Sequence, residues 1–267
     1  MNHLLRELAP ISTQSWKMLD EEARERLVPA LAARKLVDFA GPRGWSLSAT
    51  NLGRTDPIGS PPCDGVEGTS RRVLALTELR ASFQIARSEL RDADRGAADA
   101  DLGDLDRAAH QIAVAENRAV FHGWSEASIV GIAECSPHER LQLGERTDSY
   151  PRPVAAAVER LLHNGVSGPY ALALGGEQFQ RVVQTAEHGG YPLLEHLGKI
   201  LEGPIVWTPG VRGAVVVSLR GGDFLLESGQ DLSIGYDSHD RDRVQLYLEE
   251  SFTFHVATPE AAVTLEA

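Results

Sequence analysis

The chain has 267 residues, of which 42% are hydrophobic and 24% charged, so it can form one elaborated domain or two sub-domains around separate cores. Its formal net charge of −12 disfavours a nucleic-acid groove, because such grooves depend on clustered Lys and Arg. No apolar run approaches the roughly 20 residues that a membrane helix needs, and Arg6 and Glu7 stand where a signal peptide would be apolar. We therefore predict a cytoplasmic protein without nucleic-acid or membrane partners.

The first expected element is a helix over residues 15–36. Its apolar side chains recur near helical spacing, and the acidic stretch from Asp20 to Glu25 suits the first half of a helix. Pro29 removes a backbone donor and crowds the preceding turn, so it predicts a kink or two shorter helices.

Two extended arms are expected next, at residues 45–52 and 72–85, around a loop rich in Gly and Pro. Alternate residues from Val73 to Ile85 share one face over a run longer than the usual strand of about 5 to 6 residues. An isolated two-stranded hairpin is marginally stable in water. We therefore expect these arms to contact other copies of the chain.

The middle of the chain predicts one long helix and then a compact α/β region. Residues 101–123 carry a stripe of small and apolar side chains, which favours close packing of this helix on a sheet. Helices and strands then alternate, with helices expected at 153–163, 177–187 and 193–201 and strands at 170–174, 205–208 and 214–219.

The most regular pattern lies near the end, where residues 244–256 alternate between an apolar and a polar face. This alternation predicts one long strand of a sheet that packs on the long helix on one side only.

Motifs that carry chemistry are absent from the sequence. It has no Gly-x-Ser-x-Gly elbow, Walker loop, dinucleotide fingerprint or His-Glu-x-x-His zinc helix, so no catalytic residue is predicted. Consecutive Ser238, His239 and Asp240 point in different directions and indicate a turn rather than a triad. The scattered histidines and the lone Cys63 and Cys135 predict neither a metal site nor a disulfide framework.

Several blocks spread along the chain resemble the family 1 encapsulins, once described as linocin-type bacteriocins. These blocks are Arg6-Glu7-Leu8-Ala9-Pro10-Ile11, Gly44-Trp45, Asn51-Leu52-Gly53-Arg54, Phe121-His122-Gly123, Gly168-Pro169-Tyr170-Ala171-Leu172, Glu187-His188-Gly189-Gly190-Tyr191-Pro192, Gly203-Pro204-Ile205-Val206-Trp207, Leu219-Arg220-Gly221-Gly222-Asp223-Phe224, Gly229-Gln230-Asp231-Leu232-Ser233-Ile234-Gly235-Tyr236 and Leu246-Tyr247-Leu248-Glu249-Glu250-Ser251-Phe252-Thr253-Phe254.

The resemblance implies an α+β chain with the Hong Kong 97-type phage major capsid fold. The expected parts are an N-terminal helix and arm (1–44), an E-loop (45–85), a P-domain with a spine helix (86–130), an A-domain (131–221) and the return strands of the P-domain (222–267). It also implies the function of a shell subunit, which assembles with copies of itself into a hollow icosahedral cage. That cage would enclose a cargo enzyme, a dye-decolourising peroxidase or a ferritin-like protein.

Cargo binding and a pore are likewise implied by the resemblance. A groove for the cargo's C-terminal targeting peptide is expected at Arg34, Asp38, Phe39, Asp231, Leu232 and Ile234. The loop of Glu187, His188, Gly189, Gly190 and Tyr191 is expected at the five-fold pore. Ser88 stands where some relatives carry an aromatic residue linked to flavin binding, so no flavin or other cofactor is predicted.

Two other functions share some of these features. A phage or prophage major capsid protein would have the same fold, but such proteins often carry a scaffolding segment before the shell domain, whereas here the first helix is expected almost at Met1. A protease or bacteriocin-type enzyme would need a nucleophile with a nearby base, and the sequence shows no such constellation.

Overall fold

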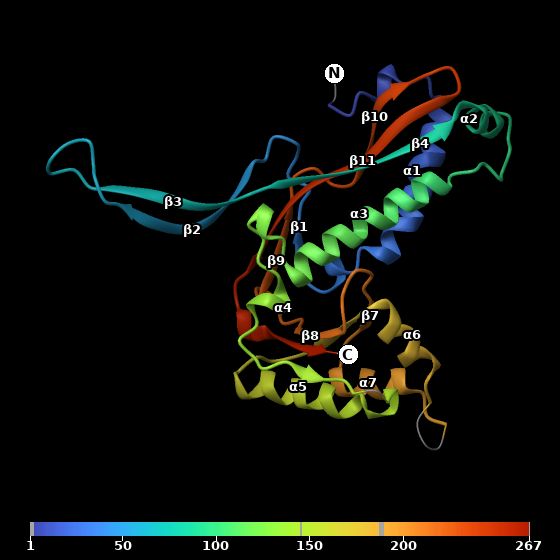
Figure 1. Ribbon diagram of the computed structural model, residues 1–267. Coiled ribbons are helices and arrows are strands. Elements are labelled where there is room, and N and C mark those ends of the chain that lie inside the picture. The colour runs from blue at the N-terminus through green and yellow to red at the C-terminus, as the bar shows by residue number, and fades with distance from the viewer. Residues whose placement is uncertain (1–2, 145, 187–189, 267) are drawn as a thin grey trace.

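The computed structural model describes residues 3–144, 146–186 and 190–266 and confirms an α+β architecture (Figure 1). The helices are α1 (Thr13–Ala30), α2 (Arg87–Asp94), α3 (Gly103–His122), α4 (Ile132–Cys135), α5 (Pro151–His163), α6 (Gly176–Gln184) and α7 (Leu193–Leu201). The strands are β1 (Asp38–Ala40), β2 (Ala49–Ile58), β3 (Gly68–Ala75), β4 (Thr77–Ala86), β5 (Leu141–Gln142), β6 (Tyr170–Leu174), β7 (Ile205–Trp207), β8 (Ala214–Ser218), β9 (Phe224–Ser228), β10 (Ser233–His239), β11 (Arg243–Val256) and β12 (Ala262–Glu266).

The first sheet is organised around β11, the long strand predicted from the alternating pattern. The strand order is β1-β9-β11-β10, and β4 also pairs with β11, antiparallel from Thr77 to Ala86. Helix α3 packs on β4 and β11, and α1 packs on α3, so two helical layers lie over this sheet (Figure 1). Their shared core includes Leu19, Leu105 and Leu246.

The second sheet has the order β5-β12-β8-β6-β7 and packs against α5, α6 and α7. Every residue of β6 and β8 is buried. Burial of side chains on both faces of these strands explains why their sequences are continuous apolar runs rather than alternating ones. The elements expected here are confirmed within a few residues, and α7 and β6 have the predicted bounds.

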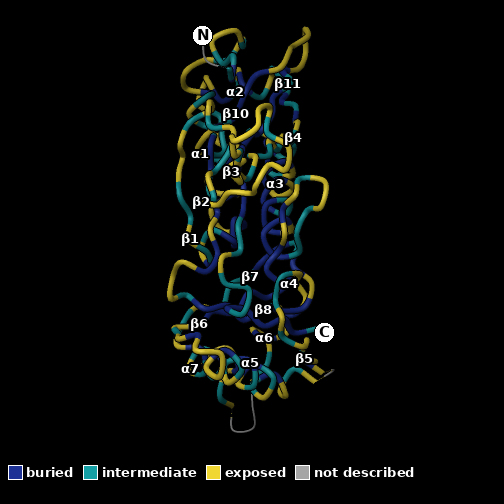
Figure 2. The backbone as a smooth tube through the Cα atoms, turned by 90° about the vertical axis from the view of Figure 1, so that its left-hand side faces the viewer, coloured by how far each residue is buried: buried dark blue, intermediate teal, exposed yellow. Residues whose placement is uncertain are grey.

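Strands β2 and β3 form a two-stranded hairpin that projects away from the rest of the chain (Figure 1). Most of its residues are exposed (Figure 2), including Ile58, Val66 and Val73, which are 51%, 51% and 53% accessible. The hairpin therefore presents apolar side chains that nothing in the monomer covers.

The two arms of the sequence prediction differ from this hairpin. The first strand continues to Ile58, well into the expected loop. The second arm is broken at Leu76, whose backbone N–H donates to the carbonyl of Ser48, and the remainder becomes β4 of the first sheet. The alternation of apolar and polar residues continues through the break and so does not reveal it. β4 buries its apolar face on α3, whereas β3 leaves the same face in solvent.

Helix α1 also differs from its prediction. Ser12 caps it by accepting a hydrogen bond from the N–H of Ser15, so the helix begins earlier than residue 15. The helix ends at Ala30, so Pro29 lies in its last turn. The proline therefore terminates the helix instead of interrupting its middle, and a short 3₁₀ turn at Ala33–Lys35 follows.

The prediction that one face of β11 is open to water is wrong. Tyr247, Glu249 and Ser251 on the polar face are all buried. Arg80 of β4 lies 3.8 Å from the centroid of the Tyr247 ring and pairs with Glu249, and the Ser251 hydroxyl accepts from the N–H of Gln230. Neighbouring polar groups thus cover this face and satisfy it.

Candidate functional site

A groove of about 410 Å³ lies between α1 and β10. Helix α1 packs on α3 and buries Leu19, while Asp20, Arg24 and Val28 on another part of its surface line the groove. The residues around the groove come from the N-terminal segment, α1, the turn after α1 and the first sheet: Leu4, Arg6, Asp20, Ala23, Arg24, Leu27, Val28, Leu31, Arg34, Asp231, Leu232, Ser233, Ile234 and Leu248.

The floor of the groove is apolar and fixed. Ile234 is 2% exposed, and Leu27 and Leu248 beside it are also buried. Leu232 is half-buried, whereas Val28 on the rim is 56% exposed. Such a surface suits aliphatic side chains of a bound peptide.

Arg34 forms one end of the groove and is held by three carboxylates. Its guanidinium donates to Asp231 at 2.7 Å, to Glu116 of α3 at 2.7 Å and to Glu250 of β11 at 2.8 Å. Asp231 also accepts from the N–H of Leu232 at 2.8 Å. The Phe39 ring lies 4.6 Å from the guanidinium carbon of Arg34. Arg34 and Asp231 are thus preorganised, with no freedom to move far when a ligand binds.

Glu116 and Glu250 are both fully buried, and one oxygen of each, Oε1, has no hydrogen-bond partner among the described residues. Burial, followed by the neighbouring Glu116 carboxylate, raises the pKa of Glu250 well above its usual value, although Arg34 opposes this shift. One guanidinium does not neutralise two buried carboxylates together with Asp231. Glu250 therefore retains its proton at pH values where an exposed glutamate has lost it.

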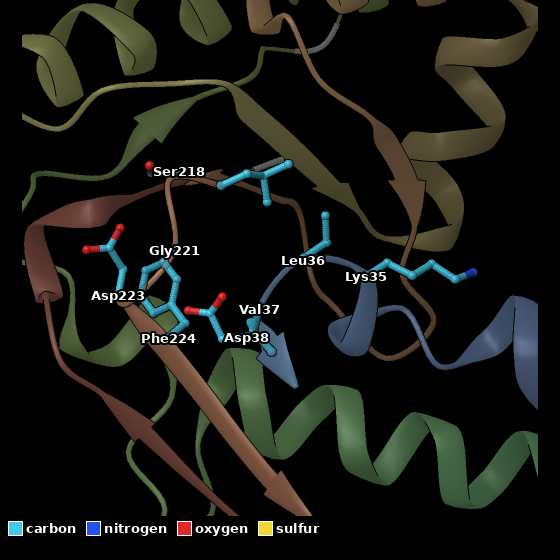
Figure 3. A pocket seen from close by; sticks show the side chains of 9 residues that line it. Lys35, Leu36, Val37, Asp38, Ser218, Gly221, Asp223 and Phe224 are labelled. Carbon is cyan, nitrogen blue, oxygen red and sulfur yellow. The ribbon is translucent and has the colours of Figure 1, made fainter. Parts of the chain in front are cut away.

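Asp38 lies outside this groove. It sits at the start of β1 and accepts a hydrogen bond from the N–H of Gly222 at 2.5 Å. Its carboxylate borders a different cavity, of about 230 Å³, beside Asp223 and Lys35 (Figure 3). Of the six residues expected at the peptide site, four line the groove, Phe39 supports Arg34 from behind, and Asp38 faces elsewhere.

The structure describes only the end of the expected pore loop. Glu187, His188 and Gly189 lie outside the described residues. Gly190 has φ +80°, a left-handed conformation that favours glycine, and the Nζ of Lys199 is 5.0 Å from the centroid of the Tyr191 ring. This contact ties the end of the loop to α7.

Sequence reasoning missed several residues of the site. Arg24 and Val28 lie on the α1 flank that faces the groove. Val28 could have been found from the sequence, because it is an apolar residue beside, not on, the stripe that α1 buries. Glu116 and Glu250 had a signal as well, since each is a carboxylate at a position that the pattern assigns to the core.

Other candidate chemistry receives no support. Within residues 3–144, 146–186 and 190–266 no group of three or more His, Cys, Asp or Glu side chains could hold a metal ion. Asp240 accepts from the N–H groups of Asp242 and Arg243, so the predicted turn between β10 and β11 is confirmed. No helix in the described part of the chain has the length and apolar character to cross a bilayer.

Comparison with known proteins accounts for both the fold and the pattern of sequence blocks. The family model described as "Encapsulating protein for peroxidase" matches residues 1–253. The Type 1 encapsulin shell protein of Rhodospirillum rubrum is 47% identical, with 99% of this chain and 96% of the relative covered. That of Rhodococcus erythropolis is 43% identical over 99% and 100%, and that of Mycobacterium tuberculosis 39% over 99% and 99%.

Solved structures are similar in fold at low sequence identity. A virus-like particle from Pyrococcus furiosus has a TM-score of 0.68 at 17% identity and covers 95% of this chain and 100% of its own. The Microbacterium phage Oxtober96 structure has a TM-score of 0.55 at 10% identity, over 88% and 91% of the two chains. The predicted Hong Kong 97-type fold is thereby confirmed.

The phage proteins share the fold with little sequence identity, whereas the shell proteins match in sequence along nearly the whole chain. Those relatives are named for a structural role in a shell and not for an enzymatic activity. This chain therefore belongs to the type 1 encapsulin shell proteins.

Proposed function

We propose that copies of this chain assemble in the bacterial cytoplasm into a hollow icosahedral shell that encloses a cargo enzyme, whose C-terminal tail binds in the groove between α1 and β10. The groove itself carries the proposal: an apolar floor around Ile234 ends at Arg34 and Asp231, which are held rigidly. Aliphatic side chains of an extended tail would fill the floor, and the fixed polar end would set its register.

A dye-decolourising peroxidase is the cargo we favour over a ferritin-like protein. The matching family model is described as encapsulating a peroxidase, which supports this choice. Either enzyme would enter by its tail, so the groove does not distinguish between the folded parts of the two cargoes.

The projecting hairpin supports assembly. Ile58, Val66 and Val73 expose apolar surface on a two-stranded ribbon that is marginal without cover. A neighbouring copy in a closed shell would supply that cover, and each copy would supply it in turn.

We also propose that residues 187–191 line the five-fold pore, a role that the family resemblance supports. Substitution of His188 by Ala should alter the entry of a small substrate to an enclosed enzyme, or the pH dependence of entry; unchanged uptake would remove His188 from the pore.

The groove is tested by Leu232→Asp and Val28→Asp. Each places a charge on an accessible part of the groove, whereas Ile234→Asp would also threaten the core, because Ile234 is 2% exposed. Val183→Asp is the matched control, since Val183 is 54% exposed on α6 and does not line the groove.

The measurement is co-purification of a dye-decolourising peroxidase, with and without its C-terminal tail, together with electron microscopy of the particles. We expect the wild type and Val183→Asp to load only the tailed enzyme and the two groove variants to form empty shells. Full loading of the groove variants would contradict the proposed site.

A further inference from the structure

A second depression, of about 490 Å³, lies farther along α1 toward the N-terminus of the helix. Three residues line both this depression and the groove: Arg6, Asp20 and Arg24. The residues that line only the second depression are Thr13, Trp16, Lys17 and Glu21. The two depressions are therefore adjacent, and the three shared residues mark the boundary between them.

The second depression offers an aromatic surface. Trp16 is half-buried, and the guanidinium of Arg6 lies 4.0 Å from the centroid of its ring. Arg6 also pairs with Asp20 at 2.8 Å, so the aromatic ring and this ion pair form one fixed unit. An apolar side chain could pack beside Trp16 without displacing a charge from its partner.

The cations around the two depressions differ in their pairing. Arg6 is neutralised by Asp20, Lys17 has Glu21 at 3.6 Å, and Arg34 has three carboxylates. The side chain of Arg24 makes no hydrogen bond or ion pair within the described residues, although it lies at the boundary shared by both depressions. An unpaired guanidinium between the apolar floor of the groove and the Trp16 ring is complementary to a peptide that carries one carboxylate between two apolar side chains.

We propose that the cargo tail extends beyond the groove into the depression at Trp16 and that Arg24 binds an acidic side chain of the tail. This inference rests on the proposed function, since the tail must first occupy the groove. The helix from Trp16 to Leu31 spans roughly 22 Å at 1.5 Å per residue, which about seven residues of extended peptide would cover. Alternate residues of such a peptide share a face, so the pattern Leu-x-Asp-x-x-x-Leu presents all three side chains to α1 and spans roughly 20 Å, with the longer spacing between the Asp facing Arg24 and the Leu facing Trp16.

Two fluorescent reporters of different colour test this inference in the assembled shell. One ends in Gly-Ser-Leu-Gly-Asp-Gly-Ser-Gly-Leu-Gly and the other in the same tail with Asn in place of Asp, and both are expressed together with the full chain. The ratio of the two colours in purified shells, corrected for expression, reports their relative binding. A tail-less reporter measures non-specific trapping.

In wild-type shells we expect about three- to tenfold enrichment of the Asp tail, the range of one charge-assisted contact at a partly exposed site. Arg24→Gln should bring the ratio to about one, and Arg24→Glu should favour a Lys tail over the Asp tail. Arg26→Gln is the control on the same helix, because Arg26 is paired with Glu22 and Asp106 and does not line either depression.

Equal loading of the Asp and Asn tails in wild-type shells, or the same ratio in wild type and Arg24→Gln, would overturn the role of Arg24 and leave the groove standing. Failure of both tails to exceed the tail-less reporter in intact shells would overturn the groove and, with it, this inference.

Discussion

The two sheets of this protein bury their interiors in different ways. The second sheet is filled by apolar side chains, and β6 and β8 are buried throughout. The first sheet buries Glu250 and, through α3, Glu116, and it holds Arg34 between them. The groove lies beside the sheet with the charged interior. The second sheet therefore contributes mainly packing, while the first combines packing with a rigid polar site.

The largest effect should come from Arg34→Ala, which leaves buried Glu116 and Glu250 without a cation. Removal of one member of a buried ion pair typically costs about 3–5 kcal/mol. Chemical unfolding at matched protein concentration measures this loss. Arg24→Ala serves as the control, because Arg24 is exposed and unpaired among the described residues; an equally small effect of both changes would show that the buried charges are not balanced by Arg34.

A truncation in the second sheet should cost somewhat less. Leu172→Ala in β6 removes a fully buried side chain and leaves a cavity, which typically costs about 2–5 kcal/mol. Unlike Arg34→Ala, it should leave the loading of cargo into those shells that form unchanged. A loss of cargo loading per assembled shell would show that packing in the second sheet affects the groove beside the first sheet.

Local pattern predicted much of the fold. The apolar run Tyr170–Leu174 and the helical spacing of Leu193–Leu201 gave the bounds that the structure has, because both elements are buried by their own side chains. The break at Leu76 was not predictable in this way. Val73 and Phe83 occupy equivalent positions in one alternating pattern, yet Phe83 is buried and Val73 is exposed.

The groove was less predictable than the fold. Arg34 and Asp231 are 197 positions apart, and their hydrogen bond depends on how α1 and the first sheet pack. No local period encodes such a meeting, so only the family resemblance pointed to it. Asp38 shows the limit of that resemblance, since it is four residues from Arg34 but faces the cavity beside Lys35 and Asp223 (Figure 3).

The charged interior also predicts that stability declines as pH rises above the ordinary pKa of a glutamate. The pKa of Glu250 is raised in the folded chain, so the native state holds a proton that the unfolded state has released. Stability from this residue should be greatest below the ordinary glutamate value and should decline as pH rises through the raised pKa. Glu250→Gln should flatten this decline in unfolding midpoints.

Glu25→Gln, an exposed change on α1, controls for the loss of one negative charge and should leave the slope as it is. Stability that declines equally in wild type and Glu250→Gln would assign the effect to another group.

The smallest expected effect lies where the two sheets join. The Nε2 of His122, at the end of α3, accepts a hydrogen bond from the N–H of Arg212 in the loop before β8, at 3.0 Å. Burial, followed by the charges of Arg212 and Arg118, lowers the pKa of His122. Its contribution should be complete above the ordinary histidine value and be lost as pH falls through the lowered pKa, because a protonated ring cannot accept.

Comparison of His122→Ala with His122→Gln separates the hydrogen bond from the charge. His122→Ala should cost about 1 kcal/mol at neutral pH, the usual contribution of one hydrogen bond. His122→Gln keeps a possible acceptor and removes the titration, so its unfolding midpoint should change less than that of the wild type between pH 7 and pH 5. If acid lowers the unfolding midpoint of both proteins equally, protonation of His122 does not weaken the junction between the two sheets. The pH dependence that distinguishes the first sheet would then come from its buried carboxylates and not from this junction.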